Sequence, residues 1–288
     1  MILFLLMMIE IEVVDCNRSK LIEFKVDNTG YWLREPNRVW HWDKTGKVDF
    51  EAKSEGRPIS FVKFRGNFII GWAARKGKYW IEIFNGSGNL LRKINDFYAD
   101  YFIIINDELH TSPSVNNPTG SALVPLENWT AKSGYFSRPL PDQNFREVWA
   151  IQIENLTYAV TQLEPYIHVF QDKQPKMIHN LAIPSFKYWE KEIDINKDDI
   201  QGSARRWFLS FSRVVGFGNI GDNLVFAFEP VGQVYTEAYL ISQKMEILRR
   251  TRFEGWAREG LWWAGTNGQA AYLFNRDSFR LLELPWPD

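Results

Sequence analysis

Cysteine is almost absent from this chain, which has Cys16 alone among its 288 residues. A single cysteine cannot form an internal disulfide, and it excludes zinc sites that need several cysteines. An excess of one charge is missing too, because 34 Lys and Arg face 35 Asp and Glu. We therefore predict no binding to nucleic acid or to an anionic membrane through overall charge.

Long hydrophobic segments are also missing, and we expect no transmembrane segment. The apolar residues 1–9 are too few to span a bilayer, and they lack the basic start of a secretory signal. Two interpretations of residues 1–18 remain open. Alternation of apolar and acidic residues over 9–14 favours an extra β-strand, whereas an apolar run before Cys16 resembles a degenerate leader with a lipid anchor at that cysteine. The location stays undecided between the cytoplasm and export in a bacterium.

Familiar catalytic and cofactor motifs are lacking as well. The four histidines have no metalloprotease spacing, and the chain has neither a Gly-x-Ser-x-Gly elbow nor a phosphate-binding loop. Gly216-Phe-Gly218 has no helix after it, so it is no dinucleotide-binding fingerprint. We predict no catalytic residue and no cofactor.

Aromatic residues, in contrast, are abundant, with 13 Trp, 21 Phe and 11 Tyr. They recur in short strand-like runs that end at polar turns, most clearly at 39–42 before the turn 43–46 and at 80–84 before 85–88. Further turns of this kind begin at 127, 171, 242 and 275. A second hairpin precedes each of them, for example 254–257 with 261–264 before the last.

Six pairs of hairpins predict six antiparallel units of four strands each. Such units, about 40 residues long, are typical of a β-propeller, whose blades bury aromatic side chains against each other. We therefore predict an all-β, six-bladed β-propeller over residues 19–288. An insertion at about 184–204 separates the fourth blade from the fifth.

The run Trp80-Ile-Glu-Ile-Phe-Asn-Gly-Ser-Gly-Asn-Leu-Leu-Arg-Lys-Ile94 closes one unit, and the repeat of this pattern over 21–284 resembles the six-bladed propellers of the NHL and TolB-like kind. The resemblance implies the propeller fold. It implies no single function, because these families include binding scaffolds, sensor domains and a minority of metal-dependent lactonases or lyases.

A ligand site is expected on the face formed by the crossings between blades and by the loops between second and third strands. The insertion is on this face, and long loops carry function more often than core strands. Arginines near the starts of several blades provide anion-binding groups, unless nearby carboxylates neutralise them as rim charges. The predicted ligand-binding residues are Arg57, Arg146, Tyr188, Trp189, Arg205, Arg206 and Trp207.

The sequence thus favours a non-catalytic binding module for a protein segment or a small polar ligand. The alternative is a metal-dependent hydrolase or lactonase with a divalent ion on the propeller axis. By residue type, its candidate ligands are Asp100, Asn106, Asp107, Asn155, Asp222 and Asn223. Most of these fall in hairpin turns, where Asn and Asp are expected for turn geometry alone, so we predict no metal ligand.

Overall fold

The computed structural model describes residues 8–9, 21–99, 101–111, 124–127, 130–131, 148–188, 202–203, 210–233, 235–254, 261–275, 278, 280–284 and 286. In these residues the regular structure is almost entirely β-strand, which confirms the all-β prediction. A short 3-10 turn, η2 (Arg75–Gly77), joins two of the strands. No helix in the described ranges is long and apolar enough to cross a membrane.

In the described residues the strands form one eight-stranded sheet and four sheets of four strands, and the strands of each four-stranded sheet follow one another in chain order. The eight-stranded sheet contains β1 (Met8–Ile9), β24 (Arg280–Glu283), β23 (Ala271–Asn275), β22 (Leu261–Thr266), β2 (Glu23–Asp27), β3 (Gly30–Arg34), β4 (Arg38–Trp42) and β5 (Val48–Lys53). The second sheet contains β6 (Arg57–Phe64), β7 (Asn67–Ala74), β8 (Lys78–Phe84) and β9 (Leu90–Asn95).

The third sheet contains β10 (Phe102–Ile105), β11 (Glu108–Thr111), β12 (Val124–Glu127) and β13 (Thr130–Ala131). The fourth contains β14 (Val148–Ile153), β15 (Leu156–Thr161), β16 (Tyr166–Gln171) and β17 (Gln174–Asn180). The fifth contains β18 (Arg213–Ile220), β19 (Asn223–Glu229), β20 (Tyr235–Ile241) and β21 (Ile247–Glu254).

The hairpin turns form for the reasons that the sequence suggests. In the β4–β5 turn the Asp43 carboxylate accepts the backbone N–H of Thr45, and Gly46 adopts a φ of 84° that favours glycine. Asn85 accepts backbone N–H groups in the same way in the β8–β9 turn. The prediction of four-stranded antiparallel sheets is confirmed at these hairpins.

The eight-stranded sheet joins the two ends of the chain. Its halves meet at one parallel pair, Val26 with Gly265, and β1 pairs with β24 at the outer edge. The expected hairpin of 254–257 with 261–264 is wrong. Glu254 is the last residue of β21, and β22 finds its antiparallel partner downstream in β23, so the N-terminal β1 supplies the strand beside β24.

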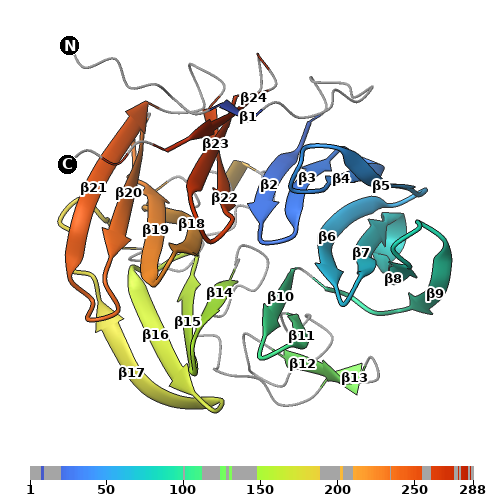
Figure 1. The fold of residues 1–288 in the computed structure, drawn as a ribbon, viewed down its shortest axis with the longest axis horizontal. Coiled ribbons are helices and arrows are strands. Elements are labelled where there is room, and N and C mark those ends of the chain that lie inside the picture. Colours follow the sequence, from blue (N-terminus) through green and yellow to red (C-terminus); the bar gives the residue numbers. More distant parts are fainter. Residues whose placement is uncertain are drawn as a thin grey trace.

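The sheets are arranged around a common centre (Figure 1). The strands nearest to it, called first strands here, are β6, β10, β14 and β18 of the four-stranded sheets and β2 and β22 of the eight-stranded sheet. Among these first strands β22 contacts β18 and β2, β14 contacts β18 and β10, and β10 contacts β6. Aromatic side chains fill the spaces between neighbouring sheets. Phe50 stacks on Phe68 of the second sheet with ring centroids 4.1 Å apart, and Trp72 is fully buried in the same cluster. This packing accounts for the high aromatic content.

Glycines let two first strands approach closely. A Cβ on Gly216 of β18 would overlap the indole of Trp263 on β22, and a Cβ on Gly218 would overlap the hydroxyl of Thr266. The motif that resembled part of a nucleotide-binding fingerprint therefore serves contact between sheets.

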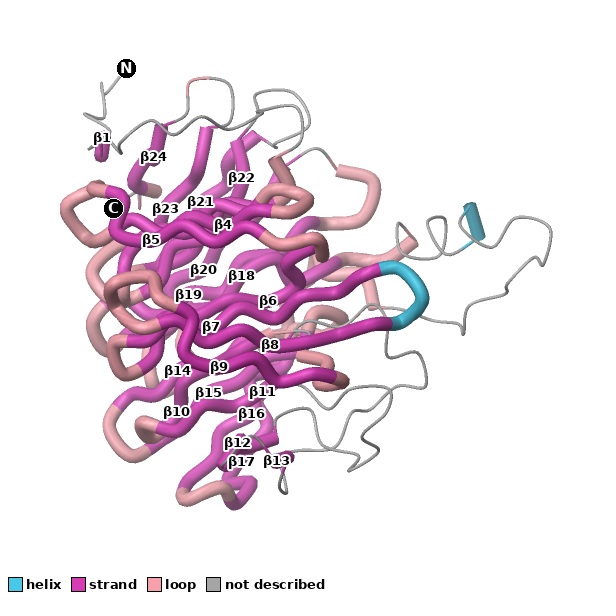
Figure 2. Tube along the Cα trace, turned by 90° about the vertical axis from the view of Figure 1, so that its right-hand side faces the viewer, coloured by secondary structure: helices cyan, strands magenta, loops and turns pink. Residues whose placement is uncertain are grey.

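The two ends of the strands differ. One end carries the turns within the hairpins, such as that between β8 and β9. The opposite end, named here the loop face, carries the second-to-third strand connections and the crossings between sheets. Figure 2 shows η2, which connects β7 to β8, projecting on this side. The crossing from β17 to β18 also starts on the loop face.

Candidate functional site

The crossing after β17 is fixed firmly to the loop face. The backbone N–H of Ser212 donates to the carbonyl of Lys187 at 2.8 Å, and the N–H of Lys187 donates to the Ser212 hydroxyl at 2.9 Å. Phe186 is buried between the fourth and fifth sheets, against Phe228. The chain that leaves at Tyr188 therefore returns at Phe211 to the same place on the loop face.

Tyr188 presents an aromatic ring at the start of this excursion. Its side chain is 37% exposed, and its ring lies edge-on to Phe186 with centroids 5.6 Å apart. The hydroxyl donates to the Asn180 side-chain oxygen at 3.4 Å. An exposed ring held by packing beneath it is suited to stack against a ligand.

A buried carboxylate lies below the same crossing. The Glu237 side chain on β20 is 0% exposed, and its two oxygens accept four hydrogen bonds. Ser185 (3.0 Å) and Tyr239 (2.7 Å) donate to Oε2, and Arg250 (2.6 Å) and Arg252 (3.0 Å) donate to Oε1. We call these five residues the Glu237 cluster. Its carboxylate has all its acceptor positions filled.

These contacts settle the charge of the cluster. Burial alone would raise the pKa of the Glu237 carboxyl, but the hydrogen bonds from Tyr239, the two arginines and Ser185 outweigh it and lower that pKa. Burial, together with the bond to Glu237, raises the pKa of Tyr239 to about 12. Glu237 is therefore ionised and Tyr239 neutral at pH 7.

Each arginine is held in place on two sides. The Arg252 guanidinium lies 3.9 Å from the centre of the Tyr235 ring, and that of Arg250 lies 5.7 Å from the Tyr239 ring. Both remain half-exposed, at 49% for Arg250 and 50% for Arg252. Glu237 binds only the Nη2 atom of each, so other N–H groups of both guanidinium groups can receive an anion.

The second sheet contains a simpler version of the same arrangement. Glu82 on β8 accepts a hydrogen bond from the Trp80 indole at 3.1 Å, and Lys93 lies 3.5 Å from Glu82 and 4.7 Å from the centre of the Trp80 ring. There one cation balances one carboxylate. The Glu237 cluster has a second cation, which neutralisation of Glu237 does not require.

The structure describes two of the seven predicted ligand-binding residues. Tyr188 follows Ser185, the Glu237 partner, by three residues and packs on Phe186, whereas Arg57 is exposed at the start of β6 in the second sheet. The structure therefore does not bring these two into one site. Arg146, Trp189, Arg205, Arg206 and Trp207 lie outside the described residues.

Sequence reasoning missed the arginines of the cluster. Arg213, at the start of β18, is paired with Glu229 on the neighbouring strand and lies apart from this cluster. A signal was present, because aromatic-x-Glu occurs at 80–82 and again at 235–237, each followed by a basic fourth strand. Without the cross-strand register, this repeat could not be assigned to a site.

The candidate metal ligands that the structure describes belong to three separate hairpin turns: Asn106 and Asp107 to β10–β11, Asn155 to β14–β15, and Asp222 and Asn223 to β18–β19. Asn106 and Asp107 form the β10–β11 turn with φ values of 52° and 54°, and Asp107 pairs with Arg65 at 2.8 Å. Asp100 lies outside the described residues. Within the described ranges no three His, Cys, Asp or Glu side chains come close enough together to hold a metal ion.

A second polar network, at the hairpin end of the first sheet, has the residue types of a hydrolase. His41 Nδ1 lies 2.5 Å from Asp49, and its Nε2 lies 3.3 Å from the Thr29 hydroxyl. That hydroxyl donates to Asp27 at 2.5 Å, and His41 is completely buried. Burial lowers the pKa of His41, so the imidazole is neutral. This geometry is that of a structural brace, which Lys63 extends to the second sheet by its 2.7 Å contact with Asp49.

Comparison with known proteins gives the fold alone. No family model matches this sequence, and no curated protein is similar enough to be matched. A member of the DUF4221 family from Bacteroides vulgatus is structurally similar, with a TM-score of 0.63, 9% identity, and coverage of 93% of this chain and 92% of that one. The AfRom2 CNH domain follows at 0.50, with 7% identity and coverage of 93% and 82%. BamB from Moraxella catarrhalis scores 0.48, with 9% identity and coverage of 92% and 84%. The neighbours have propeller-like folds.

Proposed function

We propose that this chain is a six-bladed β-propeller of the NHL and TolB-like kind, with β1 completing the sixth blade. It acts as a non-catalytic binding module that engages a protein segment or a small polar ligand on the loop face. The recognised group is an anion, held by Arg250 and Arg252 beside the Tyr188 ring.

One observation carries this proposal: two half-exposed guanidinium groups are held by a single buried carboxylate. Fixing long side chains before binding reduces the entropy lost when a ligand arrives. Guanidinium groups match carboxylate and phosphate geometry through paired N–H donors. The positive charge left over from Glu237 favours a negative partner.

The test is binding of a fluorescent oligoglutamate peptide, with an equally long oligolysine peptide as the negative probe. We expect the acidic peptide alone to bind, with affinity that falls as salt is added, because the contacts are exposed to solvent. Arg250→Gln should weaken binding by about tenfold or more, since charged contacts of this kind contribute about 1.5–3 kcal/mol.

Lys93→Gln is the matched control. It removes a cation that a Glu and an aromatic ring hold in the second sheet, on the same strand position as Arg252. Binding should be unchanged in this variant. Equal loss in both variants, or none in either, would contradict the proposal.

The residues beyond Tyr188 remain part of the proposed site. The double change Trp189→Ala with Arg205→Ala is expected to leave the melting temperature nearly unchanged and to abolish binding of the acidic peptide. If the peptide still binds with wild-type affinity, these two residues do not belong to the site.

A further inference from the structure

β21 is the last strand of the fifth sheet, and within the described residues no further strand pairs with it. Every residue of β21 from Arg249 to Glu254 is paired with a residue of β20. Leu248 has no β20 partner, because the register shifts between Arg249 and Ile247. Arg250 and Arg252 lie on one side of the strand, two residues apart, and Arg249 lies on the other. Ile247 and Leu248, each 48% exposed, stand at its start.

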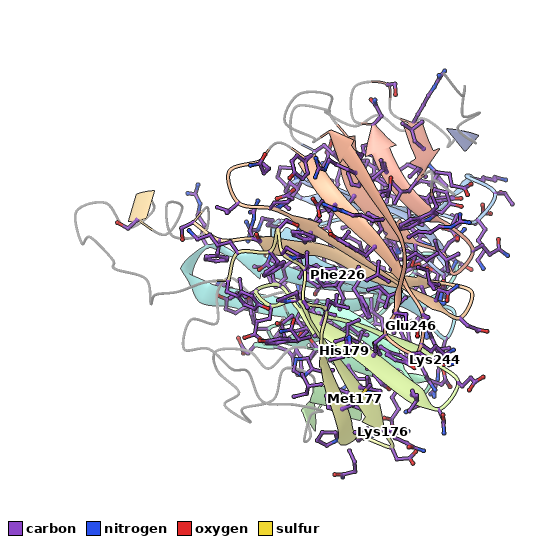
Figure 3. All side chains as sticks on the ribbon, turned by 90° about the vertical axis from the view of Figure 1, so that its left-hand side faces the viewer. Lys176, Met177, His179, Phe226, Lys244 and Glu246 are labelled. Carbon is purple, nitrogen blue, oxygen red and sulfur yellow. The ribbon has the colours of Figure 1, made fainter. Side chains whose placement is uncertain are left out.

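The outer strand of the fourth sheet carries features that discourage strand pairing. β17, on the same side of the molecule, contains Pro175, which has no backbone N–H to donate, followed by Lys176. Figure 3 labels Lys176 and Met177 of β17 and, on the same side, Lys244 and Glu246 of the β20–β21 turn. β21 has no proline and is eight residues long, against seven for β17 and six for β9.

We propose that β21 receives an extended acidic segment of a partner protein, which adds to the fifth sheet as one more strand. This inference rests on the proposed function and specifies that the partner binds as an extended strand. Charge complementarity selects the occupant, because β21 presents Arg250 and Arg252 on one side, their neighbour Glu237 is already saturated, and Glu254 is the one acidic residue of the strand.

The geometry of an added strand sets the sequence of the partner. Side chains on one face recur at every second residue, so acidic residues at alternate positions would lie opposite Arg250 and Arg252. Apolar residues at one end of the segment would cover Ile247 and Leu248. Main-chain hydrogen bonds to the β21 edge would give affinity, and the arginines would give specificity.

The probe is a short fluorescent peptide of alternating Glu and Val, measured by anisotropy. Two further peptides carry N-methyl groups on alternate residues, one on the Glu amides and the other on the Val amides. In an extended strand these amides point to opposite edges. We expect one methylated peptide to bind at least about tenfold more weakly than the parent, and the other to bind like the parent.

The outcomes separate this inference from the proposed function. If Arg250→Gln weakens binding of the parent peptide but neither methylation does, the anion site stands and strand addition is wrong. If the parent peptide does not bind, or binds Arg250→Gln equally well, both fail. Strand addition at β21 is supported if only one of the two methylated peptides binds more weakly. The parent peptide should also bind Lys93→Gln as tightly as it binds the wild type.

Discussion

Glu237 organises the surface through one buried side chain. Its carboxylate aligns two arginines and a tyrosine that come from neighbouring positions on β20 and β21. Loss of its charge would leave four donors, including Ser185, with a weaker acceptor and would release two guanidinium groups to rotate. The proposed binding surface and the local stability of the fifth sheet therefore depend on the same group.

We predict that Glu237→Gln lowers the free energy of unfolding by about 1–3 kcal/mol at pH 7, because buried donors lose a charged partner. The pKa of Glu237 is lowered in the folded protein, so its contribution is complete above the ordinary pKa near 4.5 and is lost as the pH falls through the folded value. Thermal melting from pH 7 to pH 3 should show the two proteins converging in acid. A constant difference would contradict the assignment.

His110 gives a second pH dependence, at higher pH than that of Glu237. It is completely buried on β11, and this burial lowers its pKa from 6.5 to about 4. The unfolded chain therefore takes up a proton first, and stability falls as the pH drops from 6.5 to about 4, by about 3 kcal/mol in all. His110→Gln should flatten the unfolding free energy over this interval. An unchanged slope would show that other groups are responsible.

At the level of residues, the sequence indicated the residue types of the proposed site, and its particular residues remain predictions. Arginine and tyrosine were expected, and Tyr188 does stand on the loop face. Arg250 and Arg252 were overlooked because their importance comes from Glu237, which only the antiparallel register brings beside them. The linear sequence does not show which residues lie opposite each other on neighbouring strands.

Among the elements, hairpins were the most predictable. Asp, Asn and Gly at turn positions fix the local backbone, so the β4–β5 and β8–β9 hairpins followed from sequence. The last hairpin was misplaced because its sheet is completed from the other end of the chain. β1 pairs with β24 across nearly the whole sequence, and no local signal reports such a pairing.

The contact between β18 and β22 gives a prediction for an element. Gly216→Ala places a methyl group where the Trp263 indole lies, so the indole or the strands must shift. We expect a loss of about 1–3 kcal/mol in chemical unfolding, as in other overpacked cores. Trp263→Leu in the same chain should recover part of it. Full additivity of the two changes would contradict a direct contact.

Over the whole molecule, the sheets are arranged around a common centre (Figure 1). The rival function, hydrolysis with a divalent ion on the axis, makes a different prediction for the intact protein. A bound ion raises the melting temperature, and a chelator would lower it. We expect elemental analysis to find no stoichiometric divalent ion and a chelator to leave melting unchanged. A stoichiometric ion with chelator-sensitive melting would favour the hydrolase.

The central claim is that the loop face binds an anion at the Glu237 cluster. Hydrogen–deuterium exchange of the whole chain, with and without the acidic peptide, tests its location directly. We expect slower exchange in residues 185–188 and in β21 when the peptide is present, and no change in the β4–β5 and β8–β9 turns at the opposite end. Protection confined to those turns, or unchanged exchange in β21 at saturating peptide, would contradict it.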